Sequence, residues 1–247
     1  MVHGILYSRA YNYILMYSAK CGCSTIKRFF RLIHPNASMV HEYIANEIEH
    51  IPKHIVLPRI PKIILVRNPY DRVVSMFTNK FVSTRRGPLV RYSFLNNGIP
   101  IQPFTFIAFL NKLLMLKRTG RLESIDCHIQ SQICNSKIDR NTKFIRLENI
   151  KEDIKRIYIN HIKNEKLYNS VIDNIKFLNI EFNKTPINKI IKNVTYEKFT
   201  PTTNDFPEYC HFYNKKAVDL VYRIYKRDFI RFGYSKDSYP KYIEHKE

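Results

Sequence analysis

The sequence predicts an α/β fold with a mainly parallel central sheet flanked by helices. Three stretches of the chain share one pattern, in which a short apolar run is followed by a turn and then by apolar residues at helical spacing. Apolar runs that alternate with amphipathic helices are typical of sheets with parallel strands. The 247 residues contain no internal repeat and no Gly/Ser/Pro-rich linker. We therefore expect a single domain over 1–247, since one core can still serve a chain of this length.

The first of these stretches begins with the apolar run 13–17. A polar turn occupies 18–25. Apolar side chains at i, i+3, i+4 and i+7 follow it, namely Ile26, Phe29, Phe30 and Ile33. This order predicts a strand, a loop and a helix.

The second stretch begins with the apolar run 63–66 and continues through Arg67. Asn68 suits a helix N-cap, and Pro69 suits the first helical position. The helix that follows divides into two faces. We expect an apolar face of Tyr70, Val73, Val74, Phe77 and Phe81 and a polar stripe of Asn68, Arg72, Ser75 and Asn79.

The third stretch runs from 144–147 into a helix that starts near Ile150. Two further helices are predicted over 103–118 and 215–232 from their apolar stripes. Gly233 stands where a helix C-cap belongs.

The loop after the first strand carries the features of an anion site. Helix starts present unpaired N–H groups and the positive end of the helix dipole, so they bind phosphate or sulfate. Glycine lets the backbone approach such a ligand closely, and hydroxyls can cap the helix or donate to the anion. We expect the loop to bind through Lys20, Cys21, Gly22, Cys23, Ser24 and Thr25. The lysine precedes the loop instead of following it, which differs from the nucleotide-binding Walker A spacing.

A second anion site is predicted at the end of the next strand. Arg67 ends that strand at the carboxyl edge, where open α/β sheets bind ligands. We expect Arg67 and Ser75 to converge on one phosphate, the arginine through a charge-assisted fork. The alternative is a structural Arg–Asp pair beside a helix cap.

Composition limits the partners and cofactors. The formal net charge is +20, which favours a polyanionic partner such as a nucleotide, a nucleic acid, an acidic glycan or a membrane surface. The five cysteines have no zinc or disulfide spacing, so no metal is predicted. No apolar run reaches the length of a membrane span, and no signal peptide is recognised. We expect a cytoplasmic location.

The motifs resemble those of the sulfotransferases that use 3′-phosphoadenosine-5′-phosphosulfate (PAPS), in particular the branch with the Golgi carbohydrate sulfotransferases and their bacterial and viral relatives. The loop 20–25 and the run 67–75 match that family's pattern, and Lys80–Phe81 extends the second match. Segments 126–132, 144–148 and 225–234 are similar to later family segments in the same order. Ala19 and Ile129 depart from it, because the family usually has Pro and Trp there.

The resemblance implies a P-loop-like nucleotide-binding sulfotransferase fold and PAPS as co-substrate, with no metal. It places the 5′-phosphosulfate in the loop, with Lys20 neutralising the leaving phosphate, and the 3′-phosphate at Arg67 and Ser75. It also implies a hydroxyl acceptor, expected to be a glycan. Transfer to a hydroxyl needs a general base. His128 and His41 are both candidates for that role, and Glu148 is a weaker one because an ordinary carboxylate is a poor base.

Two other functions compete with this interpretation. A nucleotide kinase would share the strand–loop–helix architecture, although the Walker spacing is absent. A non-catalytic protein that binds glycans or nucleic acid would use the basic stretches 84–87 and 184–198. We expect no specific nucleic-acid partner.

Overall fold

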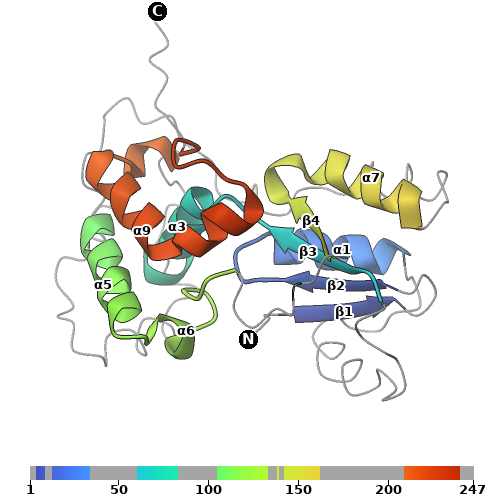
Figure 1. Ribbon diagram of the computed structural model, residues 1–247, viewed down its shortest axis with the longest axis horizontal. Helices are drawn as coiled ribbons and strands as arrows, with labels where there is room; N and C mark the ends of the chain where they lie inside the picture. The colour runs from blue at the N-terminus through green and yellow to red at the C-terminus, as the bar shows by residue number, and fades with distance from the viewer. Residues whose placement is uncertain are drawn as a thin grey trace, which may run out of the picture. The chain divides into compact units, whose positions relative to one another are not determined.

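The computed structural model describes residues 4–8, 13–33, 60–82, 105–132, 138, 142–161 and 209–239. The chain divides into two compact units, each built from two separated stretches (Figure 1). We call them the sheet unit (Met1–Arg67 with Cys134–Asn179) and the helical unit (Asn68–Ile133 with Ile180–Glu247). The expectation of one domain over 1–247 stays a prediction.

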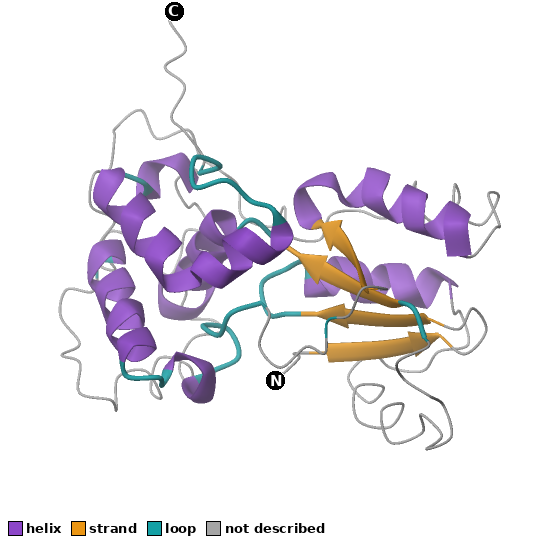
Figure 2. Cartoon of the chain, viewed as in Figure 1, coloured by secondary structure: helices purple, strands orange, loops and turns teal. Residues whose placement is uncertain are grey.

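The sheet unit contains a four-stranded sheet in the order β1-β2-β3-β4 (Figure 2). Both β2–β3 and β3–β4 are parallel pairs, while β1 is antiparallel to β2. The mainly parallel sheet of the sequence prediction is therefore confirmed. The strands are β1 (Gly4–Ser8), β2 (Tyr13–Tyr17), β3 (Lys62–Val66) and β4 (Thr142–Arg146).

The carboxyl ends of the parallel strands lie level with one another. Tyr17 pairs with Leu65, and Val66 pairs with Arg146. All residues of β2 and β3 are buried, as is typical of a sheet covered on both faces. The segments that follow β2 and β3 therefore leave the sheet at the same edge.

Helices α1 (Cys23–Ile33) and α7 (Ile150–His161) pack onto this sheet (Figure 1). Ile26 and Phe30 of α1 share one buried cluster with Ile150 and Ile154 of α7. The strands contribute to the same cluster alternate side chains from one face, namely Tyr13, Leu15, Tyr17, Ile63, Leu65 and Ile145. The 3.6-residue spacing seen in the sequence is thus the spacing of the buried faces.

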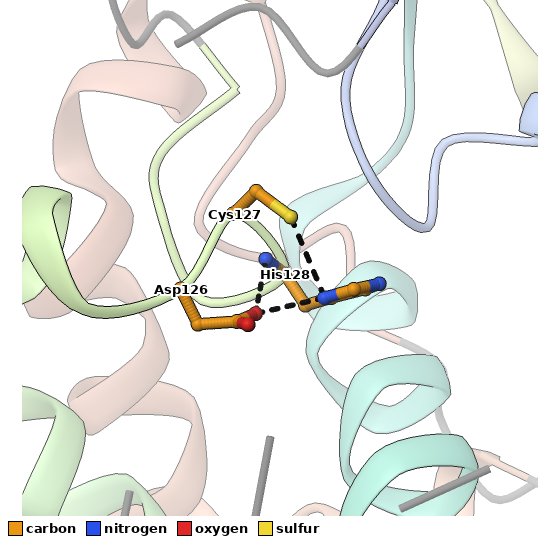
Figure 3. A group of neighbouring side chains, drawn as sticks. All are labelled: Asp126, Cys127 and His128. Carbon is orange, nitrogen blue, oxygen red and sulfur yellow. Dashed lines mark hydrogen bonds and ion pairs between the residues drawn. The ribbon is translucent and has the colours of Figure 1, made fainter. Parts of the chain in front are cut away.

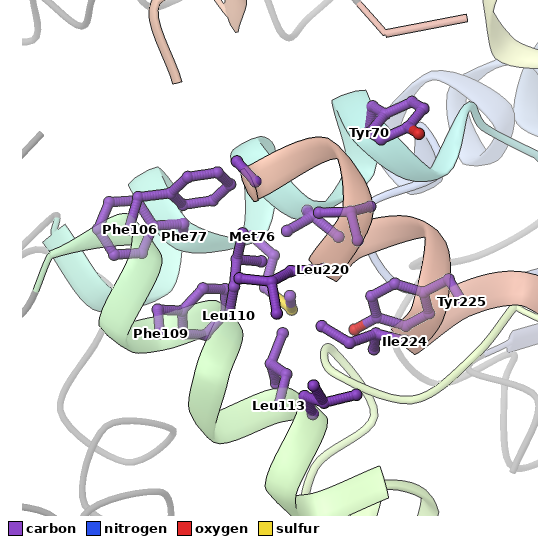
Figure 4. Close-up of a cluster of buried hydrophobic side chains, with 14 of the residues drawn as sticks. Tyr70, Met76, Phe77, Phe106, Phe109, Leu110, Leu113, Leu220, Ile224 and Tyr225 are labelled. Atoms are coloured by element: carbon purple, nitrogen blue, oxygen red, sulfur yellow. The ribbon is translucent and has the colours of Figure 1, made fainter. Parts of the chain in front are cut away.

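The helical unit is organised around a second apolar core, which includes the buried rings of Phe77, Phe109 and Tyr225 (Figure 4). Ring pairs such as Phe77–Phe106, at 5.2 Å between centroids, link its elements. The elements are α3 (Pro69–Met76), a π-helix (Phe77–Val82), α5 (Phe106–Arg118), α6 (Leu122–Ile125), a 3-10 helix (Tyr209–Phe212) and α9 (Lys215–Phe232).

The helix ends agree with the sequence signals in two cases. Asn68 caps α3 by accepting from the Tyr70 amide at 3.0 Å, with Pro69 as the first helical residue. Gly233 ends α9 with a φ of 66°. The predicted helix over 103–118 starts later, at Phe106, because Thr105 caps it through the Ala108 amide at 3.1 Å. Among the residues that the structure describes, every helix is too short or too polar to span a bilayer.

Candidate functional site

The loop between β2 and α1 has a sharply turned backbone. Lys20 has a φ of 66° and Gly22 a φ of 85°, both in the left-handed region. Between them, the Cys21 amide donates to the Ser18 carbonyl at 3.3 Å. Successive turns of this kind direct backbone amides toward one side, which is the arrangement of anion-binding loops.

Gly22 is required at its position for two reasons. Its positive φ is one that side chains disfavour. A Cβ atom built on it would also lie 2.6 Å from Leu147 Cδ1, at the end of β4. The backbone at Gly22 therefore lies closely against the Leu147 side chain, which a side chain at residue 22 would have to displace.

Helix α1 begins at Cys23, and the Gly22 carbonyl accepts from the Ile26 amide at 3.0 Å. Gly22 is thus the cap residue, and of the two uses that the sequence leaves open for the hydroxyls of Ser24 and Thr25, donation to an anion stays a prediction. Ser24 is exposed in the first turn and Thr25 is buried. Helix geometry still leaves the amides of the first turn without intrahelical carbonyls, which keeps this end suited to an anion.

The two cysteines of the loop serve its structure. Cys21 is buried, and the Cys23 thiol donates to the Ser18 carbonyl at 3.1 Å. Burial raises the pKa of the Cys23 thiol, and nearby backbone donors only partly offset this. Such a thiol is a poor nucleophile, so contributions of Cys21 and Cys23 to binding would come through the backbone.

Arg67 is brought to this loop from the end of β3. Its Nη1 donates to the Lys20 carbonyl at 3.2 Å. The contact joins residues 47 positions apart, and both lie in the sheet unit. The arginine that begins the second motif therefore lies beside the loop of the first motif, at one edge of the sheet.

Ser75 lies in α3, in the helical unit, and is half-buried. Its convergence with Arg67 on one phosphate stays a prediction. The expected polar stripe on α3 faces inward at most of its positions. Arg72 is 1% exposed, and Asn68 and Asn79 are 8% exposed each. The reason is that the side chains of Asn68 and Arg72 form hydrogen bonds with polar groups of neighbouring segments. Asn68, for example, donates to the Ser238 carbonyl at 2.8 Å.

His128 forms a hydrogen-bonded pair with Asp126 (Figure 3). Asp126 Oδ1 lies 2.8 Å from the ring Nδ1 and accepts from the His128 backbone amide at 2.7 Å. The two side chains are 20% and 17% exposed for Asp126 and His128. An aspartate that binds the backbone two residues on is an Asx turn, so the Asp-x-His spacing is the signal that could have predicted the amide bond.

Electrostatics keep Asp126 ionised. Burial alone would raise its pKa, but hydrogen bonds from the ring and amide of His128 outweigh burial, and the pKa lies below its usual value. Lys80 adds to this effect. Burial, together with the charge of Asp126, raises the pKa of Cys127 to about 11.

Asp126, Cys127 and His128 offer donor atoms within 4.8 Å of one another, so their fit to a metal ion can be examined. A metal would need Cys127 as a thiolate, and the positive charges of Lys80 and Arg72, which act on this thiol, oppose the binding of a cation here. The Nδ1–Oδ1 distance is that of a hydrogen bond. This donor set suits a hydrogen-bonded pair.

Buried polar groups hold the segment 126–132 from two helices. Arg72 of α3 donates to the His128 carbonyl at 3.2 Å. Tyr225 of α9 donates to the Ile129 carbonyl at 2.7 Å, and the fully buried Asp228 accepts from the Gln132 amide at 3.0 and 3.1 Å. Sequence reasoning did not predict these roles, since residues this far apart in the chain carry no mutual signal.

The other predicted candidates divide into two groups. Glu148 lies exposed in a 3-10 helix, Leu147–Asn149, between β4 and α7. His41 and the basic stretches 84–87 and 184–198 lie outside the described residues.

A loop and an arginine at the carboxyl ends of two adjacent parallel strands define the class of α/β proteins that bind ligands at this edge of the sheet. Within that class, the chain belongs to the sulfotransferase family, whose family model matches residues 3–235. No curated protein and no solved structure shows significant similarity to the chain. The family assignment rests on nearly the whole chain and supports sulfuryl transfer as its activity.

Proposed function

We propose that this sulfotransferase takes its sulfuryl group from PAPS and transfers it to a hydroxyl of a carbohydrate. The observation that carries the proposal is the hydrogen bond from Arg67 to the Lys20 carbonyl, which holds an arginine beside the loop at the carboxyl edge of the sheet. The donor is a nucleotide with anionic groups at its 3′ and 5′ positions. The carbohydrate acceptor is supported by the resemblance of the motifs and by the formal net charge of +20.

In this proposal, the amides at the start of α1 and the Lys20 ammonium bind the 5′-phosphosulfate. Arg67 and Ser75 bind the 3′-phosphate. The acceptor oxygen forms a bond to sulfur and loses its proton to a base, while the bond from sulfur to the bridging phosphate oxygen breaks. The electron pair stays on that oxygen, and Lys20 with the loop amides stabilises the charge that develops there.

The proposal is tested by substituting Arg67. Calorimetry with adenosine 3′,5′-bisphosphate should show binding at least tenfold weaker for Arg67→Ala, since a charge-assisted contact to phosphate is lost. Arg67→Lys should recover only part of the affinity, because lysine cannot form the fork. Arg156→Ala, on the exposed face of α7 in the same unit, is the matched control and should bind like the wild type.

Transfer itself is measured with radiolabelled PAPS and a panel of glycans. The expected result is label on a glycan with the wild type and none with Lys20→Ala. Bisphosphate binding without label on any glycan would contradict the proposed acceptor. Equal affinity of Arg67→Ala and the wild type for the bisphosphate would remove Arg67 from the donor site. A thermal shift with ATP that exceeds the shift with PAPS would support the kinase alternative instead.

A further inference from the structure

We propose that Asp126 is a positioning residue that holds His128 as the general base of the transfer, with Nε2 as the atom that takes the acceptor proton. This inference rests on the proposed function and narrows it, because the sequence leaves His128 and His41 as equal candidates.

Asp126 determines which tautomer the His128 ring adopts. An ionised carboxylate can only accept hydrogen bonds, and the pKa of Asp126 is lowered in this setting. The 2.8 Å contact with Oδ1 therefore requires a proton on Nδ1 of His128. A neutral imidazole with its proton on Nδ1 has its lone pair on Nε2. Asp126 thus selects the ring form whose Nε2 can receive a proton.

Asp126 also fixes the orientation of the His128 ring. One oxygen of Asp126 binds both the ring and the backbone amide of His128, so it ties the side chain to its own main chain. Figure 3 shows the far edge of the ring, with Nε2, directed away from both Asp126 and Cys127. The pair therefore presents the basic nitrogen away from the group that orients it.

The backbone around His128 is held in place by two buried side chains. Arg72 holds the His128 carbonyl, and Tyr225 holds the carbonyl of the next residue. The side chains of Arg72 and Tyr225 are 1% exposed each, and burial raises the pKa of the Tyr225 hydroxyl, which keeps it a donor. A base fixed in this way loses little conformational entropy when an acceptor binds.

Asp126 also stabilises the positive charge that His128 gains during the reaction. When Nε2 accepts the proton of the acceptor hydroxyl, His128 becomes an imidazolium, which Asp126 stabilises directly. Lys80 also acts electrostatically on Asp126, and both Lys80 and Arg72 act on the neighbouring Cys127.

The tautomer is tested directly by long-range ¹H–¹⁵N spectra of the labelled full-length protein, with His128 assigned by its loss in His128→Gln. The wild type should show Nδ1 protonated and Nε2 unprotonated in the neutral ring. Asp126→Asn should shift the ring toward the other tautomer, because an amide nitrogen can donate to Nδ1. A wild-type ring with its proton on Nε2 would overturn the proposal, whatever the outcome for PAPS.

Kinetics test the role. Asp126→Asn should lower kcat for sulfuryl transfer at least tenfold and leave both the acceptor KM and bisphosphate affinity unchanged. His128→Ala should lower kcat by about 10²–10⁴-fold, the usual contribution of a general base. If Asp126 acts through His128, Asp126→Asn should cause no further loss in the His128→Ala background. The exposed carboxylate in Asp237→Asn is the matched control and should leave kcat unchanged.

The outcomes separate the two proposals. If the wild type binds no bisphosphate and transfers no label, PAPS is not the donor. The spectra would still test whether Asp126 fixes the tautomer of His128. If the wild type is active and the loss of kcat in the double variant equals the product of the losses in Asp126→Asn and His128→Ala, the positioning role of Asp126 is overturned. Addition of Zn²⁺ should leave the His128 resonances in place. A zinc-dependent shift that Cys127→Ser abolishes would also overturn the proposal, by showing a metal site.

Discussion

The sheet unit and the helical unit place polar chemistry in different ways. In the sheet unit, the candidate anion site is made mainly of backbone: a turned loop, a glycine cap and the start of α1 above an apolar sheet. In the helical unit, the candidate base is held by buried polar side chains that come from α3 and α9. A backbone site depends on local conformation, whereas a side-chain site depends on contacts between distant segments.

This difference has an energetic counterpart. A loop that binds through amides is stabilised by residues that adopt unusual φ values, which costs little if glycine is present. A buried guanidinium or carboxylate is costly to leave unpaired. The helical unit should therefore respond more strongly than the sheet unit to the loss of one polar side chain.

The largest effect is expected from Arg72→Met. The substitution leaves the His128 carbonyl without its charged donor and removes a buried guanidinium that lies over the Tyr225 ring. The free energy of unfolding, measured by urea denaturation, should fall by about 3 kcal/mol. Arg223→Met, at an exposed position of α9, should change it by less than about 0.5 kcal/mol. Equal effects of the two substitutions would mean that the buried contacts of Arg72 stabilise the helical unit no more than an exposed arginine does.

A smaller effect is expected from Gly22→Ala in the sheet unit. Gly120→Ala is its matched control, because Gly120 has a φ of 70° and nothing within 4 Å of an added Cβ. The control should lose about 1 kcal/mol from the left-handed backbone alone. Gly22→Ala should lose about 2 kcal/mol, since its Cβ also meets Leu147. If the two losses are the same in urea denaturation, the close approach to Leu147 does not matter.

The smallest effect concerns the acid stability of the helical unit. The pKa of Asp126 lies below its ordinary value in the folded protein, because hydrogen bonds from His128 outweigh burial, so the unfolded chain binds this proton more readily. The stabilisation is therefore fully present above about pH 4 and is lost as the pH falls through the lower, folded-state pKa. Urea denaturation of the wild type and Asp126→Asn should show a stability difference at pH 6 that shrinks toward pH 3. A difference that stays constant over this range would contradict the assigned ionisation.

Much of the sheet unit could be predicted because its signals are local. The run 63–66 is apolar throughout, and the run 13–17 is apolar except for the hydroxyls of Tyr13 and Tyr17. Such runs suit strands buried on both faces. Strand β1 was not predicted. It is a five-residue strand between Gly4 and Ser8 that belongs to the sheet only through antiparallel pairing with β2.

The residues of the candidate anion site could be predicted where they directly follow an apolar run. Lys20, Gly22 and Arg67 were recognised from their places after apolar runs, and the structure brings Arg67 to the Lys20 carbonyl. The inward position of Arg72 could not be read from the helix pattern. Helical spacing shows which residues share a face, but not whether a polar face meets water or another polar segment.

By itself, the sequence determined the three strand–turn–helix stretches that begin with β2, β3 and β4, the need for glycine in the loop after β2 and the membership of the sulfotransferase family. These depend on neighbours within a few residues or on patterns that run along the chain. Only the tertiary structure decided that Asp126 binds His128 through both ring and backbone, and that Arg72 and Tyr225 hold the segment around them. The physical reason is that a buried polar group must find its partner wherever packing places one, and for Arg72 and Tyr225 that partner lies 56 and 96 residues away.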